Sequence, residues 1–339
     1  MQLTKCFIPV LSASALFLSS CIQQEDKLTV NSDGTSKFTV TATLKLGEVG
    51  KMMQGLGGGG GGGKSDMPTG KDLLIGIISS SEGVDVWKSA ETKTDDAGNI
   101  MATVSGYAKD VTKLKVGSAF EGMGNKGEGK GEPPPGASGH LISKKEGGKW
   151  ILGLSTTDLA GAKKPAGESK KTVSDEEVES AIQSEKGQMD MMLPMMGAML
   201  KDMKISRTIE VAGTIDDAGM FEKKDEHTAN LTIDIMKTAK GAMDFASKHP
   251  KAAKAAMAQG GKASEAITHA DMSNPAEQKA VIEAIFGKAG KPALTITPGD
   301  NLFDYSSESK KALDGQSAEL KTLLKEAAEK KSGKKDEAA

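Results

Sequence analysis

The sequence predicts an α+β fold: a mainly antiparallel sheet of β-hairpins with packed helices, followed by an Ala/Lys-rich helical C-terminal part. Three observations predict this class. Short segments that alternate apolar and polar residues flank turn-forming residues, which is the pattern of β-hairpins. Longer segments repeat apolar residues at helical spacing. The chain from Met236 onward is rich in alanine and lysine.

Residues 1–20 are predicted to be an export signal that is removed before Cys21. Lys5 gives a short positive region, and the apolar stretch from Cys6 to Leu18 has signal-peptide length but is too short to span a bilayer as a helix. The chain has 2 cysteines. Because Cys6 lies inside the signal, the mature chain has no thiol pair for a disulfide or a metal site.

The residues at the end of this signal, Leu18-Ser19-Ser20-Cys21, resemble the lipobox of bacterial lipoproteins. The resemblance implies cleavage between Ser20 and Cys21 and a diacylglyceryl group on the Cys21 sulfur. Two or three acyl chains give stable anchoring where one would be marginal. Ile22 stands where an aspartate would resemble an inner-membrane retention signal, so the outer membrane is favoured if the bacterium has two membranes.

The mature chain is close to neutral and its basic side chains are almost all lysines. The whole chain carries 44 Lys and Arg and 46 Asp and Glu. Loss of Lys5 with the signal leaves 43 basic residues, so the balance is 43 − 46 = −3. Arg207 is the sole arginine, and planar bidentate recognition of phosphate depends mainly on arginine. Nucleic acid is therefore not expected as a partner.

The segment 21–118 is predicted to form a hairpin–helix–hairpin unit. Apolar residues alternate on both sides of the turn Asn31-Ser32-Asp33-Gly34. The strands and the helix are expected at Lys27 to Val30, Lys37 to Leu44, Lys71 to Ser80, Val84 to Thr92 and Ile100 to Ala108. Residues 119–139 mix Gly, Pro and charge and are interpreted as a linker.

The segment 140–235 is predicted to share the same sheet domain. It contains a hairpin at 140–154, with Trp150 as the anchor of a small core, and a long helix from the capping box of Ser174 and Glu177 to about Met203. Pro194 is expected to kink or divide this helix. A strand pair at Ile205 to Ile215 and Thr228 to Ile235 follows, with antiparallel pairing throughout the sheet.

The segment 236–329 is predicted to be helical, with helices at 251–258, at 275–286 behind Asn274-Pro275, and at 308–330. One strand is expected at Leu294 to Thr297. Residues 330–339 are interpreted as a charged, disordered tail.

The succession of lipobox, KLTVNSDGTSKFTV hairpin, helix, second hairpin, long helix and KISRTIEVAG strand is similar to the membrane-tethered LppM-like lipoprotein domains. The similarity is one of pattern over residues 21–235 and includes no catalytic motif. It implies an α+β envelope domain without known chemistry.

A phosphate-loop pattern at Gly58 to Ser65 is interpreted as a flexible loop. The letters GGGGGGKS satisfy the pattern, but the chemistry needs a buried strand before the loop and a helix after it. No core strand precedes it, and Met67-Pro68-Thr69-Gly70 interrupts any following helix. No nucleotide is therefore expected.

The methionines of the long helix are the candidate site. Met189, Met192, Met196, Met199 and Met203 fall within about 80° of helical arc. They can continue an aliphatic core stripe or line a groove for a hydrophobic ligand. Clustered thioethers also suit Cu(I), so copper handling is the alternative.

Other reactive residues form no pattern of known chemistry. The histidines at 140, 227, 249 and 269 are scattered without zinc-site spacing. The motif Ser307-Glu308-Ser309-Lys310 matches SxxK in a chain where lysine is common. The pairs Asp95-Asp96 and Asp216-Asp217 are expected in solvated turns.

These observations predict a lipid-anchored envelope protein that faces outside the cytoplasm. The expected role is a non-catalytic module that binds a lipid, a hydrophobic ligand or an envelope protein partner. It attaches to the membrane through lipidated Cys21. No catalytic residue, metal ligand or cofactor is predicted.

Overall fold

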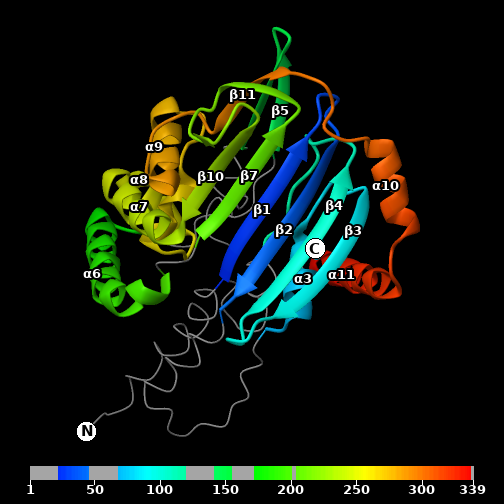
Figure 1. Cartoon of the computed structure of the whole chain (residues 1–339). Coiled ribbons are helices and arrows are strands. Elements are labelled where there is room, and N and C mark those ends of the chain that lie inside the picture. The colour runs from blue at the N-terminus through cyan, green and yellow to red at the C-terminus, as the bar shows by residue number, and fades with distance from the viewer. Residues whose placement is uncertain (1–21, 46–67, 120–140, 155–171, 201–203, 337–339) are drawn as a thin grey trace, which may run out of the picture.

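The computed structural model describes residues 22–45, 68–119, 141–154, 172–200 and 204–336 (Figure 1). Within these ranges the side chains of residues 22, 141–145, 192–200 and 333–336 are not described. The fold is α+β, as predicted, with two mostly antiparallel sheets and a C-terminal set of helices.

The larger sheet has seven strands in the order β3-β4-β2-β1-β7-β10-β9. Its strands are β1 (Ile22–Val30), β2 (Ser36–Leu44), β3 (Val86–Thr94), β4 (Ile100–Ala108), β7 (Lys204–Val211), β9 (Glu222–Lys223) and β10 (Thr228–Asp234). The two predicted N-terminal hairpins are confirmed. The expectation of antiparallel pairing throughout is wrong at one place, because β1 and β7 are parallel neighbours in the middle of the sheet.

The smaller sheet has the order β5-β6-β11-β8. Its strands are β5 (Leu141–Glu146), β6 (Lys149–Leu154), β8 (Gly213–Asp217) and β11 (Ala293–Pro298). The predicted strand from Ile205 to Ile215 is therefore two strands, and the chain passes from one sheet to the other between them. Gly213 makes this possible with a φ of 139°, and a Cβ there would collide with the carbonyl oxygen of Thr297.

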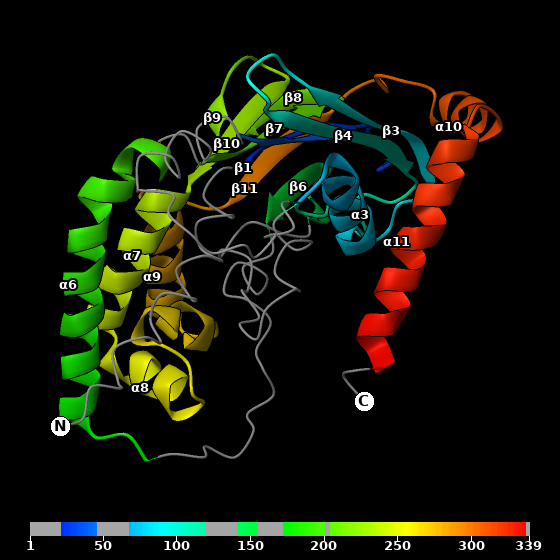
Figure 2. The same ribbon diagram turned by 90° about the horizontal axis from the view of Figure 1, so that it is seen from below.

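The helices gather in two groups beneath the larger sheet (Figure 2). One group comprises α6 (Asp175–Leu200), α7 (Ile235–Lys248), α8 (Pro250–Ala258), the 3-10 helix η1 (Ala263–His269) and α9 (Pro275–Phe286). The other comprises α3 (Gly70–Ser80), which packs against β3 and β4, and α11 (Ala318–Asp336), which packs against α3. Helix α10 (Tyr305–Asp314) lies beside the edge strand β3.

Several helix boundaries differ from the predictions. Helix α6 continues through Pro194 as one element, and its end turns away from the rest of the helix (Figure 2). Helix α7 was not predicted. The single helix expected at 308–330 is divided near Gly315 into α10 and α11. Helix α11 extends to Asp336, so much of the predicted tail is helical.

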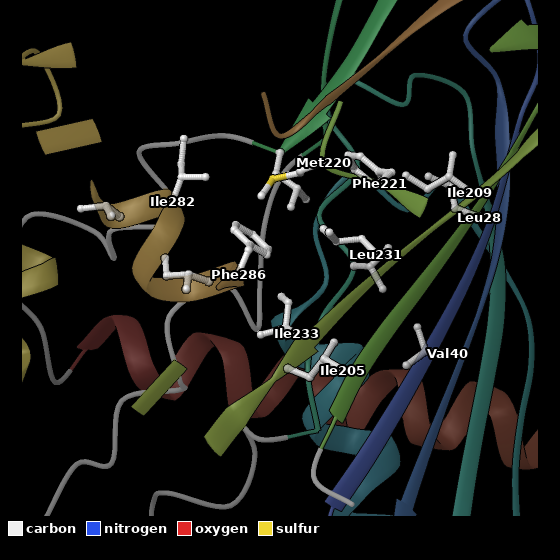
Figure 3. Packing of buried hydrophobic residues seen from close by; sticks show 14 of the residues in the cluster. Leu28, Val40, Ile205, Ile209, Met220, Phe221, Leu231, Ile233, Ile282 and Phe286 are labelled. Atoms are coloured by element: carbon white, nitrogen blue, oxygen red, sulfur yellow. The ribbon is translucent and has the colours of Figure 1, made fainter. Parts of the chain in front are cut away.

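Alternation along the strands places one face of the larger sheet in the core. Every second residue of β2, from Ser36 to Leu44, is buried. Aliphatic side chains of β1, β7 and β10 continue this face toward Met220 and Phe221, and Ile282 and Phe286 of α9 close it at one side (Figure 3). The core is aliphatic with few rings, in line with the 4% aromatic content of the chain.

Candidate functional site

The parallel pairing of β1 with β7 sets the strand that follows the predicted anchor beside the strand that follows the Met-rich helix. Strand β1 begins at Ile22, directly after Cys21, which lies outside the described residues, as does Ser20. Its register places Gln24 opposite Ile205 near the start of β7. Helix α6 ends at Leu200, shortly before β7 begins (Figure 1). The start of β1 and the end of α6 therefore belong to the same end of the molecule.

A buried ion pair lies on the core face, near the middle of both strands. Arg207 of β7 and Asp26 of β1 are in-register neighbours. The guanidinium donates from Nε at 3.1 Å and from Nη2 at 2.8 Å to the Oδ2 atom of Asp26. The two side chains are 7% and 3% exposed. Two N–H bonds to one carboxylate fix the geometry of the pair more strictly than a single lysine contact would.

Gln24 extends this pair into a network that reaches the segment after β4. Its Nε2 donates to Oδ1 of Asp26 at 2.9 Å and to the carbonyl of Gly117 at 3.4 Å. Its Oε1 accepts from the Ser118 hydroxyl and the Ala119 backbone N–H, both at 3.1 Å. Buried polar groups are costly unless their hydrogen bonds are made. Here the bonds tie β1, β7 and residues 117–119 together.

Such a network can specify the strand register, and it offers no reacting group. A one-residue slip of β1 against β7 would separate Asp26 from Arg207 and leave both charges buried and unpaired. Two signals in the sequence point to this pair. Arg207 is the sole arginine, and Asp26 stands in phase with the inward-facing Leu28. Their pairing was not predicted, because local sequence pattern does not identify the partner of a parallel strand.

The methionine site is only partly described. Met189 is half-buried, and the neighbouring Met191 is 70% exposed. Met192, Met196 and Met199 lie in α6 but their side chains are outside the described residues, and Met203 lies outside altogether. The groove and copper hypotheses thus stay predictions. The first half of α6 is fixed by Glu185, whose carboxylate accepts the backbone N–H groups of Ala263 and Ser264 at 2.8 and 3.1 Å.

The other reactive residues occupy separate places. His249 stacks on Phe245 in α7, with ring centroids 4.3 Å apart, and His227 contacts the carbonyl of Gly213. Asp216 was expected in a turn but lies in β8, where it accepts from the Thr297 hydroxyl and pairs with Lys149. Among the described residues, no group of three His, Cys, Asp or Glu side chains could hold a metal ion.

Every helix within the described ranges is too short or too polar to cross a bilayer. No protein-family model matches the chain, and no curated protein matches it. Among solved structures, the chain is similar to the NMR structure of the folded domain of the Mycobacterium tuberculosis LppM protein. The identity is 9%, the match covers 63% of this chain and 82% of that chain, and the TM-score is 0.25. Function must therefore be argued from the chain's own residues.

Proposed function

We propose that the protein is a lipid-anchored envelope lipoprotein and a non-catalytic module that binds a lipid or another hydrophobic ligand beside the membrane. The observation that carries the proposal is the parallel register of β1 and β7. It sets the strand that follows Cys21 beside the strand that follows α6, two segments that lie far apart in the sequence.

The distances support a site close to the bilayer. Cys21 adjoins the first residue of β1, so no linker separates the anchor from the sheet. The alternation of apolar and polar residues predicted the first strand only from Lys27. Leu200 is five residues before Ile205, and even a fully extended connection spans at most about 18 Å. An acylated Cys21 would therefore hold the end of α6 next to lipid.

The chemistry of methionine supports a hydrophobic ligand. Unbranched thioether side chains adapt to apolar partners of different shape, and the methionines of the predicted stripe would present several of them along one arc of α6. The large hydrophobic side chains that are exposed in the described ranges are single residues, which are ordinary for a protein surface. They are Met101, Met191, Leu302 and Leu313. Met191 lies outside the arc of the stripe, so it is the stripe that favours α6 for such contacts.

The anchoring step is tested by labelling cells with radioactive palmitate and separating the membrane and soluble fractions. Cys21→Ser should abolish acylation and release a soluble or uncleaved form. Cys6→Ser is the matched control, since that cysteine lies within the cleaved signal, and it should leave acylation unchanged. A Cys21→Ser protein that is fully cleaved and still membrane-bound would contradict the proposal. Mass spectrometry of wild-type protein from native membranes would report a carried ligand directly.

A further inference from the structure

Strand β3 is the outermost strand of the larger sheet on the side of α10 (Figure 1). It pairs with β4 on one side, and no strand within the described ranges pairs with its other side. Such an edge presents backbone N–H and C=O groups that can pair with a further strand. The first part of the edge is covered, because the Trp87 carbonyl accepts from the Gln316 side chain at 2.7 Å. Residues 91–98 are all exposed.

The hydrogen bonds of the β3–β4 turn show which backbone groups of β3 point outward. The Asp95 N–H donates to the Asn99 carbonyl at 3.0 Å, so the backbone of Asp95 faces β4. Successive residues of an antiparallel strand alternate in this respect, and the register against β4 is regular over this part of β3. The N–H and C=O groups of Ala90, Thr92 and Thr94 therefore point away from β4, where a partner strand would lie.

The side chains of this part of β3 form a charge pattern that is complementary to itself. Glu91 and Lys93 stand opposite Thr103 and Met101 of β4, on the face of the sheet opposite the helices (Figure 2). Both are exposed, and neither has an ion-pair partner within the described residues. In an antiparallel pair of two β3 strands with its twofold axis at Thr92, each Glu91 lies directly opposite Lys93 of the second copy. Symmetry makes this contact twice.

Neighbouring registers of such a pair are less favourable. Opposite residues must both point outward or both point inward, so the axis passes through a residue and not between two residues. An axis at Glu91 or at Lys93 places a charged residue opposite itself, and like charges directly opposite each other are destabilising. An axis at Ala90 runs into the covered part of the edge. An axis at Thr94 requires residues beyond the end of the strand. The axis at Thr92 alone avoids these problems.

We infer that the protein forms a symmetric dimer in which two copies of β3 pair antiparallel about Thr92 and join the two larger sheets into one. The pairing makes backbone hydrogen bonds at alternate residues of β3 and two ion pairs between Glu91 and Lys93 of opposite copies. Its twofold axis is perpendicular to the sheet. Lipid anchors at the two Cys21 residues would therefore lie at the same depth in a bilayer parallel to the sheet.

The test measures self-association of the full chain by sedimentation velocity, in detergent with micelles in large excess over protein. Wild type should form dimers at about 100 µM, since a small interface of this kind binds in the micromolar range. Glu91→Lys and Lys93→Glu should each weaken association by about tenfold or more, because each substitution turns two attractive contacts into two repulsive ones. Both side chains are exposed, so the circular dichroism and the melting temperature should be unchanged.

Two combinations of these substitutions distinguish the proposed pairing from other modes of association. The double variant Glu91→Lys with Lys93→Glu restores opposite charges at both contacts and should associate like wild type. A mixture of the two single variants should form dimers with one copy of each, because one strand then carries two positive charges and the other two negative charges. Glu25→Lys is the matched control, since Glu25 is exposed in the same row of the sheet but on the central strand β1, and it should leave association unchanged.

The inference is overturned if wild type sediments as a monomer at the stated concentration, or if neither single charge reversal differs from Glu25→Lys. It is also overturned if the double variant stays as weak as the single variants, or if the mixture associates no better than either variant alone. None of these results depends on acylation of Cys21 or on a ligand at α6, so this inference and the proposed function fail separately.

Discussion

Arg207 of β7 and Asp26 of β1 face each other in register across the parallel strand pair, and two guanidinium N–H groups share one carboxylate oxygen at 3.1 and 2.8 Å. Removal of one partner leaves the other charge buried and uncompensated. Arg207→Met should therefore lower the free energy of unfolding by about 3–5 kcal/mol. Urea unfolding followed by circular dichroism measures the change.

The double variant Asp26→Leu with Arg207→Met tests whether the ion pair stabilises the fold or only fixes the register of β1 against β7. Replacing both charges by apolar side chains should recover most of the stability, because the desolvation cost disappears with them. Arg207→Lys keeps the charge but loses the planar guanidinium group that makes two hydrogen bonds, so this variant should remain destabilised. A single Arg207→Met variant within about 1 kcal/mol of wild type would show that the network contributes little.

The passage of the chain between the two sheets depends on Gly213. Gly213→Ala places a Cβ against the Thr297 carbonyl at a φ of 139°, a conformation that other residues rarely adopt. We expect a loss of at least about 2 kcal/mol. Gly98→Ala is the matched control, because Gly98 also has a positive φ but no atom within 4 Å of the added carbon. Equal thermal shifts for the two variants would contradict the collision argument.

Tyr107 should titrate far above ordinary tyrosines. Burial, and then its hydrogen bond to Glu308 at 3.1 Å, raise its pKa to about 12 from 10.0. The folded state thus favours the neutral phenol. Its contribution to stability is complete below pH 10 and is lost as the pH rises through about 12.

Ultraviolet titration of the Tyr305→Phe variant isolates this group. Addition of Glu308→Gln should lower the Tyr107 midpoint, because the carboxylate charge disappears. An unchanged midpoint would mean that burial alone raises the pKa of Tyr107.

The Met-rich end of α6 is tested by volume-conserving substitution. Met192, Met196 and Met199 changed together to leucine should scarcely alter stability, since such swaps usually cost less than about 1.5 kcal/mol. If these residues contact ligand, the amount of co-purified lipid should fall at unchanged stability. A triple Met101, Met257 and Met272→Leu variant controls for methionine loss elsewhere. Equal lipid in both variants would argue against a groove at α6.

Local pattern predicted the hairpins well because alternation and turn chemistry are both local signals. Strand β4 has the bounds predicted for it, and β2 begins one residue earlier than expected. The early start of β1 was missed because Gln24 and Asp26 face inward, where apolar residues are the rule. Only the network with Arg207, remote in sequence, makes those polar positions stable.

In the helical region, local signals likewise predicted one helix and missed another. Helix α9 was predicted with its bounds from Asn274-Pro275 and the apolar residues behind it, and Gly287 ends it in the structure. Helix α7 was missed because glycine and threonine weaken its interior. In the structure, Gly241 lets α7 approach the backbone of α9, and the Thr238 hydroxyl donates to the carbonyl of Ile285 at 2.8 Å. These contacts are tertiary, and no local window of sequence contains them.

The central place of β1 also decides how the protein bears mechanical load. A pull on the chain at Ile22 runs along a strand that is flanked by β2 on one side and β7 on the other. Both ladders are then loaded in shear, so their hydrogen bonds resist together and cannot open one after another as in unzipping. A force along β1 therefore has to break two ladders at once, whereas a force on the edge strand β3 has only the ladder to β4 to break.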